Sequence, residues 1–250
     1  MTTLAILPAA HAPAARAPAC RLVFTSAGPR GTALSESTAG SPWRVVRATT
    51  AQHCDATLVQ TQGGVLDGDR WRVDVHAEQD TSVRLHAVGA TIAHRGASAT
   101  RTRLRVARGA TLTWRSPGVI AMEGARLRIS TIVDVDRGAR AAASEILATA
   151  HAHDAVLRLV VIRDSAVLYE ERTGFHDARQ PWRLGTATHL GTAVAITPDA
   201  TTRARRWNRA LHSSGAATSP RPSLLVARVL GSSLQEVDAL LGPLVDELIS

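Results

Sequence analysis

The residues with the clearest potential for chemistry lie in the loop 63–69, which reads Gly-Gly-Val-Leu-Asp-Gly-Asp between two strand-like runs. Glycine enters positive φ at little cost, so this composition indicates a defined turn. Its two carboxylates have two interpretations: they cap the amides of the turn, or they form a polar entrance for a hard or borderline cation. The pattern G-G-x-L-x-G-D is carried by Gly63, Gly64, Leu66, Asp67, Gly68 and Asp69.

A second group of side chains has ligand types that suit Ni²⁺ or Zn²⁺. His151 and His153 would share one face of a strand, although a solvated strand end explains them as well. His76 and His86 are expected on facing strands of one hairpin. Glu145 follows an apolar run, where a carboxylate facing the core is costly unless it is paired or lines a wet channel; otherwise it faces solvent. Together with the loop aspartates, the candidate ligands are Asp67, Asp69, His76, His86, Glu145, His151 and His153.

Several classes of catalyst lack their motifs in this chain. There is no lysine, so a phosphate-binding P-loop cannot form, and there is no G-x-S-x-G element. The sequence therefore predicts a protein that is not an enzyme and that holds no permanently bound cofactor. The alternative is a β-helical carbohydrate-active enzyme that uses Asp67, Asp69 or Glu145 as acid and base.

The charge of the chain favours acidic partners. The net charge is +8, and all 29 basic residues are arginine, which forms bidentate pairs with carboxylates and phosphates. Aromatic residues make up only 3% and do not interleave with arginine clusters, so nucleic acid is not expected as a partner. A basic helix is predicted over 201–212. Its arginines form either a solvated face or a docking surface for an acidic partner, and they are Arg203, Arg205, Arg206 and Arg209.

The remaining composition bounds the environment. No run of about 18 apolar residues is present, so no membrane-spanning helix is expected. Two cysteines cannot build a disulfide framework, which favours a reducing compartment and a cytoplasmic location. The Ala/Pro-rich segment 1–19 is predicted to be a disordered tail.

Alternation of apolar and polar residues predicts that the chain is mainly β. Strand–turn–strand units recur about every 30 residues, at 71–87, 103–114 and 129–146, and a fourth hairpin is expected at 156–170. Such spacing indicates a layered, β-helix-like stack of hairpins, forming a single domain over 20–250. The residues expected to be buried by this alternation are Val73, Val75, Leu104, Val106, Leu127 and Ile129.

Helical signals occur near the end of the chain. Besides 201–212, a helix is predicted over 233–249, because Ser233 and Glu236 have the spacing of a capping box. Pro243 is expected to kink or split that helix. The Ser/Ala/Pro/Gly-rich segment 213–222 is expected to be a mobile loop.

The ordered motifs resemble those of the UreD (UreH) family of urease accessory proteins. Besides the loop 63–69, Gly109–Trp114 is similar to a G-A-x-L-x-W element, and Pro117–Ala125 resembles a P-x-x-I-x-F-x-x-A element with Met122 in place of Phe. The strand 141–147 resembles the one that carries the family's glutamate, here Glu145. The following segment, 148–154, departs from the family's G-R and G-E-x-F motifs, so the chain is identified as a divergent member.

The resemblance implies a UreD-like β domain that acts as a scaffold. Such proteins bind apo-urease and, with UreF and the GTPase UreG, deliver nickel to its active site. Nickel would then be a transient cargo that passes through the interior. A plain Arg-rich β binding module for an acidic ligand is a further alternative.

Overall fold

The structure is a computed structural model that describes residues 19–38, 42–49, 52–148, 154–176 and 187–248. The predicted tail 1–19 lies outside this part, except for Ala19, which begins the first strand. Within the described residues, no helix is long and apolar enough to cross a membrane.

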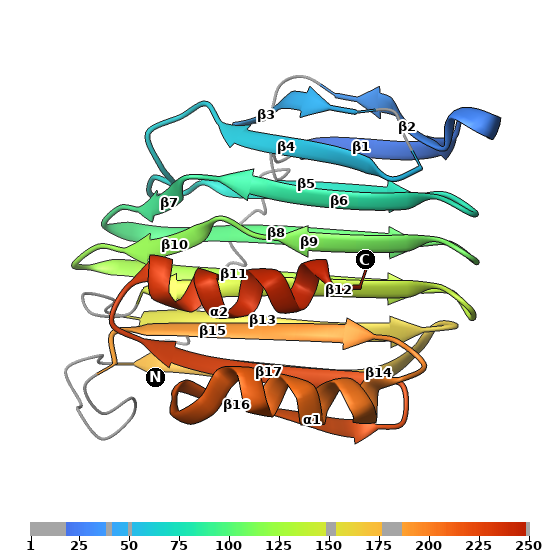
Figure 1. The fold of residues 1–250 in the computed structure, drawn as a ribbon. Coiled ribbons are helices and arrows are strands. Elements are labelled where there is room, and N and C mark those ends of the chain that lie inside the picture. Colours follow the sequence, from blue (N-terminus) through green and yellow to red (C-terminus); the bar gives the residue numbers. More distant parts are fainter. Residues whose placement is uncertain (1–18, 39–41, 50–51, 149–153, 177–186, 249–250) are drawn as a thin grey trace, which may run out of the picture.

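Two β-sheets lie face to face, and their strands stack along one axis (Figure 1). The seven-stranded sheet has the order β14-β13-β11-β8-β5-β1-β2. Its strands are β1 (Ala19–Ser26), β2 (Thr32–Ser37), β5 (Arg70–Ala77), β8 (Gly96–Val106), β11 (Ala125–Val135), β13 (Asp154–Arg163) and β14 (Ala166–His176).

The ten-stranded sheet has the order β16-β17-β15-β12-β9-β6-β4-β3, with β7 and β10 paired beside this path. Its strands are β3 (Trp43–Ala48), β4 (Cys54–Gln60), β6 (Ser82–Val88), β7 (Ala90–Ala93), β9 (Thr111–Arg115), β10 (Gly118–Ala121), β12 (Arg140–Ala148), β15 (His189–Ile196), β16 (Gly215–Arg221) and β17 (Leu224–Gly231). Two short 3₁₀ turns are η1 (Gly28–Arg30) and η2 (His212–Ser214).

A regular repeat winds the chain between the sheets. Strands on consecutive turns are parallel, and residues 29 positions apart are paired, as Thr57 and His86 are. The same offset joins Arg70 to Ala99 and Gly96 to Ala125. The mainly β, β-helix-like stack is therefore confirmed, and so is its repeat of about 30 residues.

The units of the stack differ from the prediction in one respect. Three of the expected hairpins are arches, because β5 and β6, β8 and β9, and β11 and β12 lie in opposite sheets. Only the fourth, β13–β14, is an antiparallel hairpin. Alternation determines which side chains point inward, but it does not determine which two strands pair with each other. All six residues predicted to be buried are buried, with exposed fractions of 5% or less.

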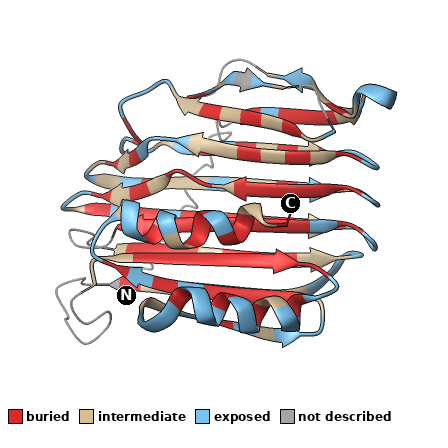
Figure 2. Cartoon of the chain, viewed as in Figure 1, coloured by how far each residue is buried: buried red, intermediate tan, exposed pale blue. Residues whose placement is uncertain are grey.

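Two helices cover the ten-stranded sheet: α1 (Ala200–Leu211) and α2 (Leu234–Asp246). The strands below them are buried on both faces, as β15 is along most of its length in Figure 2. A Cβ on Gly191 would lie 2.4 Å from Val237, so glycine lets α2 approach β15 closely. The helix continues through Pro243 without the expected split.

The segment 213–222 is not the expected loop. It holds η2 and the edge strand β16, which pairs with β17. Its composition hid the strand because an edge strand tolerates proline, here Pro220, whose neighbours shift register against β17.

The start of α2 gives a direct test of the helix cap. Ser233 accepts a hydrogen bond from the Glu236 amide at 3.1 Å, and Glu236 in turn accepts one from the Ser232 amide at 2.7 Å. We expect Ser233→Ala to destabilise the protein by about 1 kcal/mol in urea unfolding, because the amide loses its acceptor. Ser233→Asp, an equally good cap, should restore wild-type stability. Equal stability of all three proteins would contradict this role.

Candidate functional site

The loop 63–69 is held against residues 92–97, which lie one repeat further along the stack. The Val65 amide donates to Ile92 at 2.8 Å, and the Val65 carbonyl accepts from the His94 amide at 2.9 Å. Asp67 Oδ1 accepts from the Ala97 amide at 2.6 Å. Asp69 Oδ2 closes the turn by accepting from the Leu66 amide at 2.9 Å. Both aspartates therefore cap backbone amides, and the loop is a built structural turn.

Each aspartate keeps a second oxygen outside these contacts. Both side chains line a hollow of about 490 Å³ together with Asp154, Arg126 and Arg128. Asp154 already forms an ion pair with Arg128 at 2.6 Å. No group of three or more His, Cys, Asp or Glu residues within the described ranges is arranged to hold a metal ion. The loop thus offers polar lining rather than a closed cation site.

The space between the sheets contains a row of polar side chains that runs along the stacking axis. On the ten-stranded sheet, Glu145 of β12 is paired in register with Thr192 of β15, and Thr192 with Arg228 of β17. On the seven-stranded sheet, Thr131 of β11 is paired with Thr102 of β8. We call these the interior polar row: Thr102, Ser116, Thr131, Glu145, Glu171, Thr192 and Arg228.

Two contacts join the sheets across this row. Thr131 donates to Glu145 Oε1 at 2.5 Å. Arg228 Nη2 lies 2.7 Å from Glu171 Oε1. Glu171 also accepts from Tyr169 and Thr173, each at 2.8 Å. The row therefore begins at a buried carboxyl and ends at an ion pair with extra hydrogen bonds.

The pKa values of the two carboxyl groups in the row are shifted in opposite directions. Burial raises the pKa of Glu145 above its ordinary value, and hydrogen bonding from Thr131 only partly opposes this. Burial would also raise the pKa of Glu171, but hydrogen bonds from Arg228, Tyr169 and Thr173 outweigh it and lower the pKa of that carboxyl. Glu145 is thus biased toward the neutral acid, whereas Glu171 is held as a carboxylate.

A cavity of about 30 Å³ adjoins Glu145, with Ser116, Trp114 and Thr102 among its lining residues. This volume is enough for one water-sized particle. Trp114 Nε1 and Ser116 Oγ are buried without a hydrogen bond of good geometry, yet both are close enough to Glu145 to lower its pKa as donors. The cavity is therefore lined by polar groups that act on the Glu145 carboxyl.

The other end of the row opens into a larger groove. Arg228 and Thr173 line a groove of about 750 Å³, with Leu190 and Glu236 on its walls. Leu190 is buried, whereas the Arg228 side chain is about half exposed. The polar row therefore reaches the surface at this edge of the stack.

The predicted histidine ligands do not come together. His76 and His86 are not on one hairpin, because β5 and β6 lie in opposite sheets and both side chains alternate with inward-facing neighbours. His86 instead lies 3.0 Å from Thr57 Oγ1, and burial followed by the charge of Arg115 lowers its pKa. His151 and His153 lie outside the described residues.

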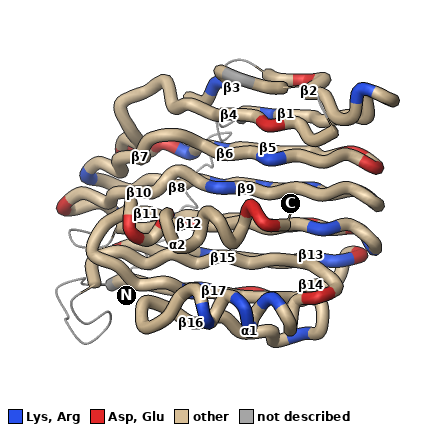
Figure 3. The backbone as a smooth tube through the Cα atoms, viewed as in Figure 1, with Lys and Arg blue, Asp and Glu red and all other residues tan. Residues whose placement is uncertain are grey.

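The basic side chains of α1 divide into two kinds, and the helix carries them along its length in Figure 3. Arg203 and Arg206 form ion pairs with Glu247 at 2.9 and 2.7 Å, so they tie α1 to the end of α2. Arg205 and Arg209 are exposed. Only this second pair is presented to a partner without an internal ion pair in the described structure.

Most members of the interior polar row were missed by sequence reasoning. Glu145 was singled out because its strand is otherwise apolar. Thr131 and Thr192 occupy inward positions of apolar strands. Their place in the alternation of each strand was the sequence signal that could have identified them. Pairing across the sheets could not be predicted, because the contact between Arg228 and Glu171 joins residues 57 positions apart.

The fold and the interior row define a two-sheet β-solenoid with polar groups in its interior. The family model described as UreD urease accessory protein matches residues 16–249. A urease accessory protein UreD from Dechloromonas aromatica is 29% identical over 255 residues, which cover 92% of this chain and 88% of the relative. One from Chromohalobacter salexigens is 30% identical over 202 residues, covering 72% and 64%. A UreD 2 from Saccharopolyspora erythraea is 31% identical over 153 residues, covering 56% and 54%.

The chain belongs to the UreD family of urease accessory proteins. At about 30% identity to these relatives it is a divergent member. Membership supports an accessory role toward urease and a partnership with the urease machinery.

Proposed function

We propose that this protein is a cytoplasmic urease maturation factor that binds apo-urease and, together with UreF and UreG, helps to deliver nickel to the urease active site. It has no catalytic turnover of its own. The observation that carries the proposal is the interior polar row, with Glu145 buried between the sheets and with Trp114 and Ser116 beside it at the small cavity.

If Glu145 had only a structural role, its burial would carry a cost in the free energy of folding. A carboxyl group placed between two sheets is less favourable than an apolar side chain of similar size. The strand itself supplies apolar neighbours at the adjacent inward positions, Ala143 and Leu147. A carboxyl oxygen at this position provides what a passing divalent cation requires, an oxygen ligand that binds without closing a full coordination shell.

The transfer of a cation past Glu145 requires its deprotonation. Cations bind the carboxylate form, and because burial raises the pKa of Glu145, protons compete with nickel for this group more strongly than for an exposed glutamate. This competition weakens binding, which suits a group that has to release its cargo. The scattered candidates Asp67, Asp69 and His76 are compatible with weak contacts elsewhere.

Co-expression with the urease subunits and the remaining accessory proteins tests the proposal. We expect Glu145→Gln to lower urease activation at least ten-fold at limiting nickel, because the amide cannot supply an anionic ligand. Co-purification of the variant with apo-urease should remain at the wild-type level. The nickel content of the isolated urease, measured by mass spectrometry, should fall in parallel with activity.

Thr131→Val is the matched control. It removes the hydrogen bond to Glu145 but leaves the carboxyl in place, so activation should stay within about three-fold of wild type, which is a barrier change below about 1 kcal/mol. Full activation by Glu145→Gln would contradict the role of the interior row. Failure of the wild-type chain to bind apo-urease would contradict the scaffold role itself.

The carbohydrate-active alternative has less support. Its acidic residues do not converge, since Asp67 and Asp69 line a surface hollow whereas Glu145 lines the cavity between the sheets. A pair of catalytic carboxyls must flank a shared substrate bond. Hydrolysis of glycosidic bonds by the purified chain, lost in Asp69→Asn, would nevertheless restore this candidate.

A further inference from the structure

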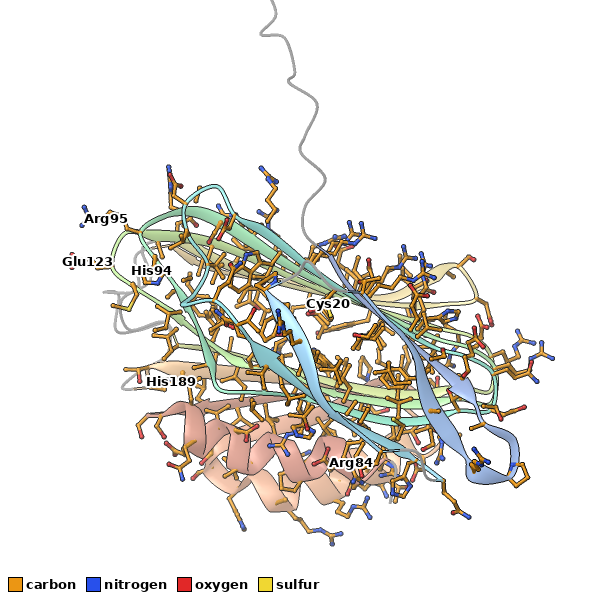
Figure 4. All side chains as sticks on the ribbon, turned by 90° about the horizontal axis from the view of Figure 1, so that it is seen from above. Cys20, Arg84, His94, Arg95, Glu123 and His189 are labelled. Atoms are coloured by element: carbon orange, nitrogen blue, oxygen red, sulfur yellow. The ribbon has the colours of Figure 1, made fainter. Side chains whose placement is uncertain are left out.

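The outer face of the seven-stranded sheet is not covered by either helix. Both α1 and α2 pack on the ten-stranded sheet, and Figure 4 shows them on one side of the stack while side chains with nitrogen ends project from the other. The strands from β1 through β5, β8 and β11 to β13 are parallel. Both faces of parallel sheets are usually covered, so this face, which neither helix covers, is a candidate docking surface.

Arginine dominates this open face. The outward positions of its strands carry ten arginines and five carboxylates, as the alternation and register of the strands define them. We call this surface the arginine face. Its basic members are Arg21, Arg70, Arg72, Arg101, Arg103, Arg105, Arg126, Arg128, Arg158 and Arg172, and its acidic members are Glu36, Asp74, Asp134, Asp154 and Glu170.

Internal ion pairs use only half of these arginines. Each of the five carboxylates has one arginine partner on the face, at distances from 2.6 to 3.5 Å. The other five have no ion pair with any residue in the described ranges, and all are exposed. They are Arg70, Arg101, Arg105, Arg126 and Arg172. The face therefore keeps an unbalanced positive charge spread over several strands.

The arginine face has a hollow near its centre. It measures about 150 Å³ and is lined by Arg21, Arg72, Asp74, His76, Arg103 and Arg105. Asp74 is paired in register with Arg103, and His76 with Arg105, so the basic groups surround the hollow from adjacent strands. Guanidinium groups recognise carboxylates with two parallel hydrogen bonds. A single carboxylate side chain fits both the size and the charge of this hollow.

We propose that the arginine face docks an acidic surface of another protein, with a partner carboxylate seated in the central hollow. The interleaved carboxylates favour a protein over a nucleic acid, because they would repel a continuous phosphate backbone. A membrane is disfavoured by the apolar residues of this face, of which Ile132, Val156 and Val160 are buried and cannot insert. Alternating charges also fix the register of a protein partner.

Fluorescence anisotropy with a labelled poly-L-glutamate peptide of about 20 residues tests the proposal on the full-length protein at low salt. We expect Arg101→Glu/Arg105→Glu to weaken binding at least ten-fold. Neither residue has a side-chain ion pair or hydrogen bond with a described residue, so the substitutions remove no such contact within the described ranges. The matched control is Arg205→Glu/Arg209→Glu on α1, which makes the same change in net charge on the opposite side and should weaken binding less than three-fold.

Arg101→Gln/Arg105→Gln provides a second variant that adds no negative charge and should weaken binding at least three-fold with an unchanged unfolding midpoint. Equal losses in the sheet and helix variants would overturn the proposal, since binding would then follow net charge alone. Absence of peptide binding by the wild type would also overturn it. A 20-base-pair DNA duplex and phosphatidylserine vesicles serve as competing probes. Tighter binding of either, lost in the sheet variant, would assign the face to that class instead.

Discussion

Gly64→Val is expected to prevent folding or to destabilise the protein by about 4 kcal/mol or more, the range of severe backbone and packing defects. Gly64 has φ 134, and a Cβ at this position would lie 2.3 Å from the Ile92 carbonyl oxygen. That oxygen accepts the Val65 amide hydrogen bond, so it cannot move without breaking the contact between the loop and β7. His94, which Figure 4 places on the same side of the stack as Arg95 and Glu123, would be displaced as well.

Two neighbouring glycines separate the causes of this effect. A Cβ on Gly63 or on Gly68 would meet nothing within 4 Å, but Gly68 has φ 82. Gly63→Val should therefore change stability by less than about 0.5 kcal/mol, whereas Gly68→Val should cost about 1–2 kcal/mol from backbone strain alone. Unfolding in urea gives all three values. Similar stabilities for the Gly64 and Gly63 variants would contradict the close approach to Ile92.

The three glycines of the loop show how much of its structure the sequence could predict. Composition indicated that glycines are needed, and their positive φ values at Gly64 and Gly68 agree with it. Composition could not distinguish backbone strain at a glycine from a steric clash of an added side chain. At Gly64 the clashing atom is the carbonyl oxygen of Ile92 in β7, 28 positions later in the chain. The amides that the two aspartates cap were predictable only in part, since Asp69 caps Leu66 within the loop, whereas Asp67 caps Ala97, 30 positions later in the chain.

The sequence likewise predicted part of the fold, namely its strands and their inward faces, but not the pairing of the strands. Alternation identified the strands and their inward faces, since burial of Val73, Leu104 and Leu127 depends only on parity along each strand. Whether a turn closes a hairpin or an arch depends on the pairing partner. A turn such as Arg108-Gly109 is consistent with both, and here it leads from one sheet to the other. The prediction that His76 and His86 lie on one hairpin was wrong for this reason.

The interior polar row shows which part of the candidate site could not be predicted from the sequence. Glu145 was recognisable as an anomaly within its own strand. Its partner Thr131 and the distant pair of Glu171 with Arg228 arise from two sheets meeting face to face, which local patterns do not encode. The arginine face is similar, because arginine alternation predicts exposure on any strand but not that both helices pack on the other sheet.

Glu145→Gln is expected to alter the pH dependence of stability in a defined direction. Burial raises the pKa of Glu145, so the folded state holds this proton more tightly than the unfolded chain does. The resulting stabilisation is fully present below the ordinary glutamate pKa of about 4.3 and is lost as pH rises through the raised value, at about 1.4 kcal/mol for each unit of elevation. Glutamine has no proton to lose, so the variant should gain on wild type as pH rises above about 4.3, until the raised pKa of Glu145 is passed.

Glu171→Gln is the control with the opposite sign. Hydrogen bonds from Arg228, Tyr169 and Thr173 hold the pKa of Glu171 below its ordinary value despite burial. Its contribution is therefore present above the ordinary glutamate pKa and is lost as pH falls through the lowered one. This variant should lose about 1–3 kcal/mol at pH 7, and less below pH 4. Urea unfolding of the three proteins at each pH gives the two difference curves. A flat difference between wild type and Glu145→Gln at all pH values above about 4.3 would contradict the raised pKa of Glu145.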